Sequence, residues 1–183
     1  MKIILASNSP RRKDLLKNAG VKFEILPSTA LEREILNGES VEDYAKNLAL
    51  IKAQSVFEKT QNVVVGADTI VVLNGEILKK PKSSKDAENM LLRLSNKTHV
   101  VITGYAVVSK DKIIDGYEQT RVTFNDLSSG VISSYIDSNL WSGKAGGYGI
   151  QDGYPLVKEI SGDYDNVVGL PTKKILSILE ELK

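Results

Sequence analysis

The sequence predicts an α/β protein with a mixed sheet, because strand-like and helix-like segments alternate along its 183 residues. Short β-branched apolar runs, of which residues 63–73 form the longest, are typical of buried strands. Helix-capping residues precede several segments whose apolar side chains recur at helical spacing. Neither a repeat nor a low-complexity tail breaks this pattern, so we expect a single domain over residues 1–183.

The predicted elements follow from local signals. Strands are expected at residues 2–6, 23–26, 98–108, 112–124 and 156–160, and residues 63–73 are expected to form a strand pair or one bent strand. A serine before each of four predicted helices is the expected N-cap, namely Ser9, Ser40, Ser83 and Ser128. Asn74-Gly75 predicts a hairpin turn, residues 143–153 predict a glycine-rich loop, and a last helix is expected to begin at Pro171 or Thr172.

Composition excludes several classes of protein. Lys and Arg number 24 against 23 Asp and Glu, so the chain lacks the basic excess of a nucleic-acid coat protein. The absence of cysteine excludes disulfides and thiolate chemistry and fits a reducing compartment. Because no apolar run approaches the roughly 20 residues of a membrane helix, we expect a cytoplasmic protein without nucleic-acid or membrane partners.

The segment Ser7-Asn8-Ser9-Pro10-Arg11-Arg12-Lys13 lies where a strand gives way to a helix. The first turn of a helix offers free N–H groups and partial positive charge, which three added cations oppose. A bound anion would be favoured there by the N–H groups, the hydroxyls and the guanidinium groups. We therefore predict an anion site, against the alternative of a helix start with solvated basic residues.

Asp68-Thr69 lies inside the apolar run Val63–Leu73. A carboxylate in such surroundings is costly unless it is paired, hydrogen-bonded or bound to metal. Gly66, two residues earlier, allows close approach of backbone or ligand. We predict that Asp68 is a metal-binding and base carboxylate, and the alternative is an aspartate that caps a turn.

Two further sets of residues suit a nucleotide. Lys52 on a predicted apolar helix and Lys80 before Pro81 could meet a triphosphate, although a solvated face explains most single lysines. The loop from Lys144 to Gln151 is rich in glycine, and the amide of Gln151 could read a base edge; the alternative is a mobile surface loop.

Metal chemistry is restricted by the residues available. His99 is the only histidine, and it is expected to be a satisfied structural residue. With one histidine and no cysteine, any metal must be held by oxygen, so we expect Mg²⁺ or Mn²⁺.

Taken together, these features resemble the Maf family nearly from end to end. Six motifs occur in the family's order: Ser7-x-Ser9-Pro10-Arg11-Arg12, Gly66-Ala67-Asp68-Thr69, Lys80-Pro81, Thr98-His99-x-Val-x-Thr103, Lys144-Ala-Gly-x-Tyr-x-Ile-Gln151 and Gly169-Leu170-Pro171.

The resemblance implies two lobes, a strongly curved mixed sheet flanked by helices around a deep cleft, as in inosine triphosphate pyrophosphatases, and a homodimer. It also implies hydrolysis of a nucleoside triphosphate between its α- and β-phosphates. Asp68 is then the general base and a metal ligand, with Glu32 near the same metal. The residues expected to bind substrate are Ser7, Ser9, Arg11, Arg12, Lys52, Thr69, Lys80, Lys144 and Gln151.

Ile150-Gln151 resembles the branch of the family that prefers dTTP and UTP, with modified uridine triphosphates as further candidates. A purine enzyme acting on inosine triphosphate or 7-methyl-GTP, and a non-catalytic nucleotide-binding regulator of cell division, are the alternatives. Two positions depart from the family's pattern. Gly143 replaces the usual Asp before Lys144, and Asp152 stands where a glycine is common.

Overall fold

The structure, a computed structural model, describes residues 1–182 and confirms the predicted α/β class. Its strands form one seven-stranded mixed sheet in the order β2-β1-β3-β5-β6-β7, with β4 beside β3. Strand β1 pairs in parallel with β2 and β3, whereas β4 and β7 run antiparallel to β3 and β6.

The observed boundaries agree closely with the predicted ones. The strands are β1 (Ile3–Leu5), β2 (Glu24–Ile25), β3 (Val63–Leu73), β4 (Glu76–Leu78), β5 (Thr98–Val108), β6 (Ile113–Phe124) and β7 (Val157–Ser161). The helices are α1 (Pro10–Asn18), α2 (Val41–Thr60), α3 (Ser84–Leu94), α4 (Ser129–Asp137), α5 (Tyr164–Val168) and α6 (Thr172–Glu181), with a 3₁₀ turn, η1, at Ala145–Gly147. Helix α5 was not predicted, because five residues are too few to show helical periodicity. The short strand β4 and the turn η1 were not predicted as elements either, since each has only three residues. No helix in the described part is long and apolar enough to cross a membrane.

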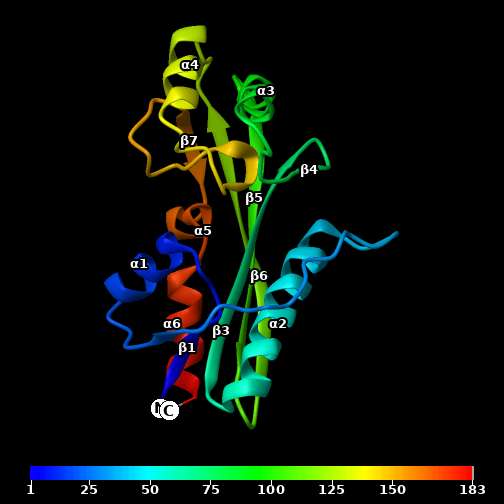
Figure 1. The fold of residues 1–183 in the computed structure, drawn as a ribbon, viewed down its shortest axis with the longest axis vertical. Coiled ribbons are helices and arrows are strands. Elements are labelled where there is room, and N and C mark those ends of the chain that lie inside the picture. Colours follow the sequence, from blue (N-terminus) through cyan, green and yellow to red (C-terminus); the bar gives the residue numbers. More distant parts are fainter. Residues whose placement is uncertain (183) are drawn as a thin grey trace. The chain divides into compact units, whose positions relative to one another are not determined.

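The chain divides into two compact units (Figure 1). The first unit comprises residues 1–69, 103–118 and 169–183, and the second comprises residues 70–102 and 119–168. Strands β3, β5 and β6 contribute residues to both. Two units agree with the two predicted lobes, while the curvature of the sheet and the cleft stay predictions.

The core of the first unit has two layers, because side chains of a strand alternate between its faces. Ile3 and Leu5 of β1 pack with α1 and α6, whereas Ile4 and Ala6 pack with α2. Figure 1 shows α2 on one side of β1 and β3, with α1 and α6 on the other. Both faces of these strands are therefore buried, which explains their unbroken apolar sequences.

Helix α2 lies directly on the sheet because the residues between them are small. A Cβ atom added at Gly66 of β3 would lie 2.5 Å from the carbonyl oxygen of Ala49, and one at Gly104 of β5 would lie 2.1 Å from that of Ala45. No side chain other than hydrogen fits at either glycine. This close approach brings Lys52, one turn beyond Ala49, to the strand that carries Asp68.

The core of the second unit gathers around Tyr135, Phe124 and His99. His99 lies within β5, fully buried, with its Nε2 2.7 Å from the hydroxyl of Tyr148. Burial lowers the pKa of His99 to about 4. Its Nδ1 has no hydrogen-bond partner among residues 1–182. His99 is thus packed as a structural residue, but the prediction that it would be fully satisfied is wrong for Nδ1.

Candidate active site

The turn from β1 into α1 is held by the serines of the first motif. The hydroxyl of Ser7 accepts the N–H of Ser9 at 3.1 Å. Ser9 is the N-cap of α1, and its hydroxyl accepts the N–H of Arg12 at 3.5 Å. Pro10 opens the helix, where its missing N–H costs nothing. Arg11 follows in the first turn and is partly exposed.

Arg12 turns its guanidinium back toward the sheet. Its Nε donates to the carbonyl oxygen of Gly169 at 2.7 Å, one terminal nitrogen to Ser7 at 3.3 Å, and the other to the Thr69 hydroxyl at 3.0 Å. Burial lowers the pKa of Arg12, and the negative charge of Asp68 partly offsets this. The group is thereby fixed in position and still charged.

Two residues that sequence reasoning left without a role complete this arrangement. The buried hydroxyl of Thr103 lies 2.9 Å from that of Thr69, and Gly169 supplies the carbonyl oxygen that Arg12 meets. Thr103 was detectable as a hydroxyl inside a buried apolar strand. Gly169 has a φ of 135°, which favours glycine, but nothing in the sequence indicated its partner.

Asp68 and Lys52 form a largely buried ion pair, with side chains 13% and 15% exposed. The Nζ of Lys52 donates to Asp68 Oδ1 and, at 2.9 Å, to Oε1 of Glu32. Glu32 comes from the long loop before α2 and is 56% exposed. The Lys52 ammonium thus lies between two carboxylates that are 36 residues apart in sequence.

Two adjacent residues in the middle of β3 face opposite sides of the sheet. Asp68 follows Val64 and Gly66 at every second residue, so it faces α2 and Lys52. Thr69 follows Val65 and Ala67, so it faces α1 and Arg12. Asp68 therefore meets Lys52 on one side of β3, and Thr69 meets Arg12 on the other side.

The two carboxylates fit a hard divalent cation. Asp68 and Glu32 share one cation, the Lys52 ammonium. Residues 1–182 hold no group of three or more His, Cys, Asp or Glu side chains suited to a metal. Two carboxylates with remaining positions left to water and phosphate oxygens are the usual protein share for Mg²⁺.

The remaining predicted residues lie in the second unit. Lys80 is exposed after β4, just before the buried Pro81. The N–H of Gly146 donates to the carbonyl oxygen of Lys79 at 3.2 Å. The loop that carries Lys79 and Lys80 therefore lies beside the glycine-rich loop. Gln151 is exposed on the latter loop, whereas Lys144 is buried.

The structure thus brings the predicted residues together in two groups. One group belongs to the first unit and comprises Ser7, Ser9, Arg11, Arg12, Glu32, Lys52, Asp68 and Thr69. The other belongs to the second unit and comprises Lys80, Lys144 and Gln151.

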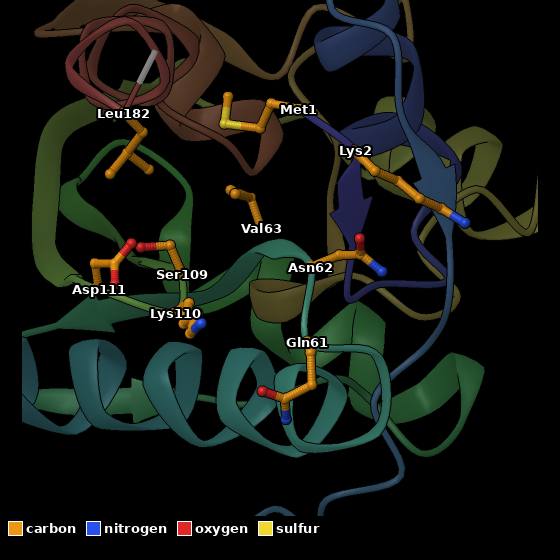
Figure 2. A pocket seen from close by; sticks show the side chains of 9 residues that line it. All are labelled: Met1, Lys2, Gln61, Asn62, Val63, Ser109, Lys110, Asp111 and Leu182. Atoms are coloured by element: carbon orange, nitrogen blue, oxygen red, sulfur yellow. The ribbon is translucent and has the colours of Figure 1, made fainter.

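The first unit also has a cavity of about 460 Å³ that contains none of these residues (Figure 2). It is lined by Met1, Lys2, residues 61–63, the turn at residues 109–111 and Leu182. These residues lie where β1 and β3 begin, while Asp68 and Thr69 come several residues later in β3. The cavity is therefore separate from the candidate site.

Fold and site define the class: an α/β protein that carries a carboxylate–lysine pair and a fixed arginine where a parallel pair of strands ends. The chain belongs to the Maf-like protein family, whose model matches residues 2–182. It is 48% identical to a dTTP/UTP pyrophosphatase of Pyrococcus furiosus, covering 98% of this chain and 94% of that protein. It is also 48% identical to a dTTP/UTP pyrophosphatase of Bacillus cereus, covering 98% and 95%.

Among solved structures, the chain is similar to the Ham1 protein of Staphylococcus aureus. The TM-score is 0.49 at 17% identity, covering 69% of this chain and 73% of that one.

Proposed function

We propose that the protein hydrolyses nucleoside triphosphates, dTTP and UTP foremost, to the nucleoside monophosphate and pyrophosphate. One observation carries the proposal: Asp68 and Glu32 share the Lys52 ammonium, and Arg12 is fixed against Thr69, the residue next to Asp68. A carboxylate pair that accepts one cation suits a metal, and the neighbouring cations suit the phosphates. The dTTP/UTP pyrophosphatases that are 48% identical over almost the whole chain support the substrate.

Enzymes of this kind generally use divalent metals, and we infer that Asp68 and Glu32 hold Mg²⁺ or Mn²⁺ together with the phosphates. The bound metal would neutralise phosphate charge and polarise the attacking water. The fit rests on the Lys52 ammonium, which already satisfies both carboxylates from a single position. Lys52, once released from the carboxylates, is near enough to the same site to pair with a phosphate oxygen.

Asp68 is the proposed general base. It orients a water molecule and takes its proton while the water oxygen bonds to the α-phosphorus. The bond from the α-phosphorus to the bridging oxygen breaks, and its electron pair leaves with pyrophosphate. Arg12 and Lys52 stabilise the charge that develops on this leaving group. The first turn of α1 adds the partial positive charge of a helix N-terminus.

Lys80 is proposed to meet the triphosphate, and Gln151 the base. Both side chains are exposed, and their loops are joined at Lys79 and Gly146. An amide both donates and accepts, so it can match the carbonyl and N–H edge shared by thymine and uracil.

The proposal extends to the setting of the enzyme. We infer one catalytic domain over residues 1–183 that works in the cytoplasm as a homodimer, with a nucleotide rather than nucleic acid as its partner. The family match over residues 2–182 supports the single domain, and the near-balanced charge supports a nucleotide rather than nucleic acid as the partner.

A substrate panel tests the function. Pyrophosphate release is measured from dTTP, UTP, CTP, ITP, GTP and 7-methyl-GTP with Mg²⁺ or Mn²⁺, and again with EDTA. We expect metal-dependent cleavage concentrated on dTTP and UTP. Cleavage of ITP or 7-methyl-GTP instead would overturn the substrate, and binding without any cleavage would favour the regulator.

A further inference from the structure

A buried charge network lies inside the glycine-rich loop of the second unit. Lys144 donates through its Nζ to both carboxylate oxygens of Asp152, each at 2.6 Å. The two side chains are only 9% and 6% exposed. Tyr135 of α4, fully buried, donates its hydroxyl to Asp152 at 2.6 Å. The same hydroxyl accepts the N–H of Gly149 at 3.0 Å.

These contacts close a ring between residues 144 and 152. A Cβ atom at Gly149 would lie 2.6 Å from Asp152 Oδ2, so only glycine lets the carboxylate reach this position. Gly146 and Gly147, both with φ near 70°, turn the chain within the ring. Tyr135 ties the ring to α4, a regular helix.

Lys144 is held by this network rather than presented to solvent. Two of its donors meet Asp152, and removing either charge would leave the other buried without its counter-ion. The pair therefore acts within the loop, and the direct substrate contact expected for Lys144 from sequence stays a prediction.

Gln151 is the exposed residue directly before Asp152. Fixing the carboxylate of Asp152 fixes the backbone from which the Gln151 amide extends. We propose that Asp152 is a positioning residue that sets the direction of Gln151 and thereby the preference for thymine and uracil. This proposal rests on the proposed function, because it assumes that Gln151 meets the base.

The test compares Asp152→Asn and Tyr135→Phe with Asp137→Asn, an exposed control on α4. For the first two variants we expect the KM for dTTP to rise about tenfold, because each variant loses one or two hydrogen bonds of the network. We expect little change in kcat. Discrimination against CTP and ITP should fall by a similar factor. The double variant Lys144→Met/Asp152→Asn, which leaves no unpaired buried charge, should show the same KM change in a protein that melts higher than Asp152→Asn alone.

Hydrogen exchange in the nucleotide-free protein separates this proposal from the proposed function. The Gly149 amide should exchange about tenfold faster in Tyr135→Phe than in the control, whatever the substrate panel gives. Unchanged exchange together with unchanged KM and discrimination would overturn the proposal. So would a loss of kcat equal for all nucleotides at constant KM, because it would place Asp152 in the chemical step.

Discussion

Replacing Lys52 with methionine is expected to tighten metal binding while it slows turnover. The Lys52 ammonium lies against Asp68 and 2.9 Å from Glu32, so it competes with a divalent cation for the same two carboxylates. Methionine keeps the length and the apolar stem of the side chain but removes the charge. Metal affinity should thus rise while turnover falls, whereas a variant that is only less stable would not bind metal more tightly.

The size of the change follows from the geometry. A hydrogen bond between charged groups contributes about 1.5–3 kcal/mol. A metal ion that displaces Lys52 must make up this interaction. Because Glu32 is more than half exposed, solvent screens its share, and we take the lower end. The metal Kd should therefore fall about tenfold in the variant.

The assay is titration of Mn²⁺ into nucleotide-free protein, followed by calorimetry or by the electron paramagnetic resonance of free Mn²⁺. Lys59→Met is the matched control, since Lys59 lies on the same helix but donates to Thr29. Turnover of dTTP should fall about 10²-fold in Lys52→Met alone, the usual cost of losing one transition-state charge partner. Metal affinity that is unchanged or weaker in Lys52→Met would refute the competition.

Three other substitutions test the packing and charge that support the site. Gly66→Ala should cost about 1–3 kcal/mol of unfolding free energy in urea, because its methyl group would push α2 off β3. As the pH falls from about 6.5 to about 4, the wild type should lose about 1.4 kcal/mol of unfolding free energy per pH unit relative to His99→Asn. In that window the unfolded histidine gains a proton, whereas burial keeps the folded pKa of His99 at about 4. Arg12→Lys should lower kcat/KM for dTTP about 10²-fold, since one ammonium cannot meet both Gly169 and Thr69 as the guanidinium does.

Each of these has a control or a contradicting outcome. Gly130→Ala on α4, where a Cβ meets only a serine hydroxyl at 3.9 Å, should be neutral or stabilising. Parallel stability profiles for His99→Asn and wild type between pH 6.5 and 4 would contradict the buried neutral histidine. Arg93→Lys, on the exposed Glu76 pair, should leave kcat/KM unchanged, and an equally active Arg12→Lys would remove Arg12 from the leaving-group site.

Local signals explain why the elements could be predicted so well. Ser9, Ser40, Ser83 and Ser128 each cap their helix through a side-chain oxygen, as expected. Asn74-Gly75 forms the predicted turn, with both residues at positive φ. Caps, turns and hydrophobic periodicity depend on neighbours within a few residues, so they can be read directly from sequence.

The site depended on contacts between distant residues, which no local signal contains. Sequence reasoning found Lys52 and Asp68 separately, but their contact follows from the close approach of α2 at Gly66. It gave Thr103 no role, although it is joined to Arg12 through Thr69. The alternation of side chains along β3, with Asp68 on one face and Thr69 on the other, could be read from the sequence. Which helix covers each face could not.

The central claim is that the carboxylate of Asp68 drives hydrolysis, and pyrophosphate release from dTTP by Asp68→Asn tests it most directly. Asp111→Asn, an exposed carboxylate in the turn between β5 and β6, is the matched control. The account predicts that Asp68→Asn still binds dTTP but turns over about 10²–10⁴-fold more slowly, the usual share of a general base. Turnover of Asp68→Asn close to that of the control would contradict it.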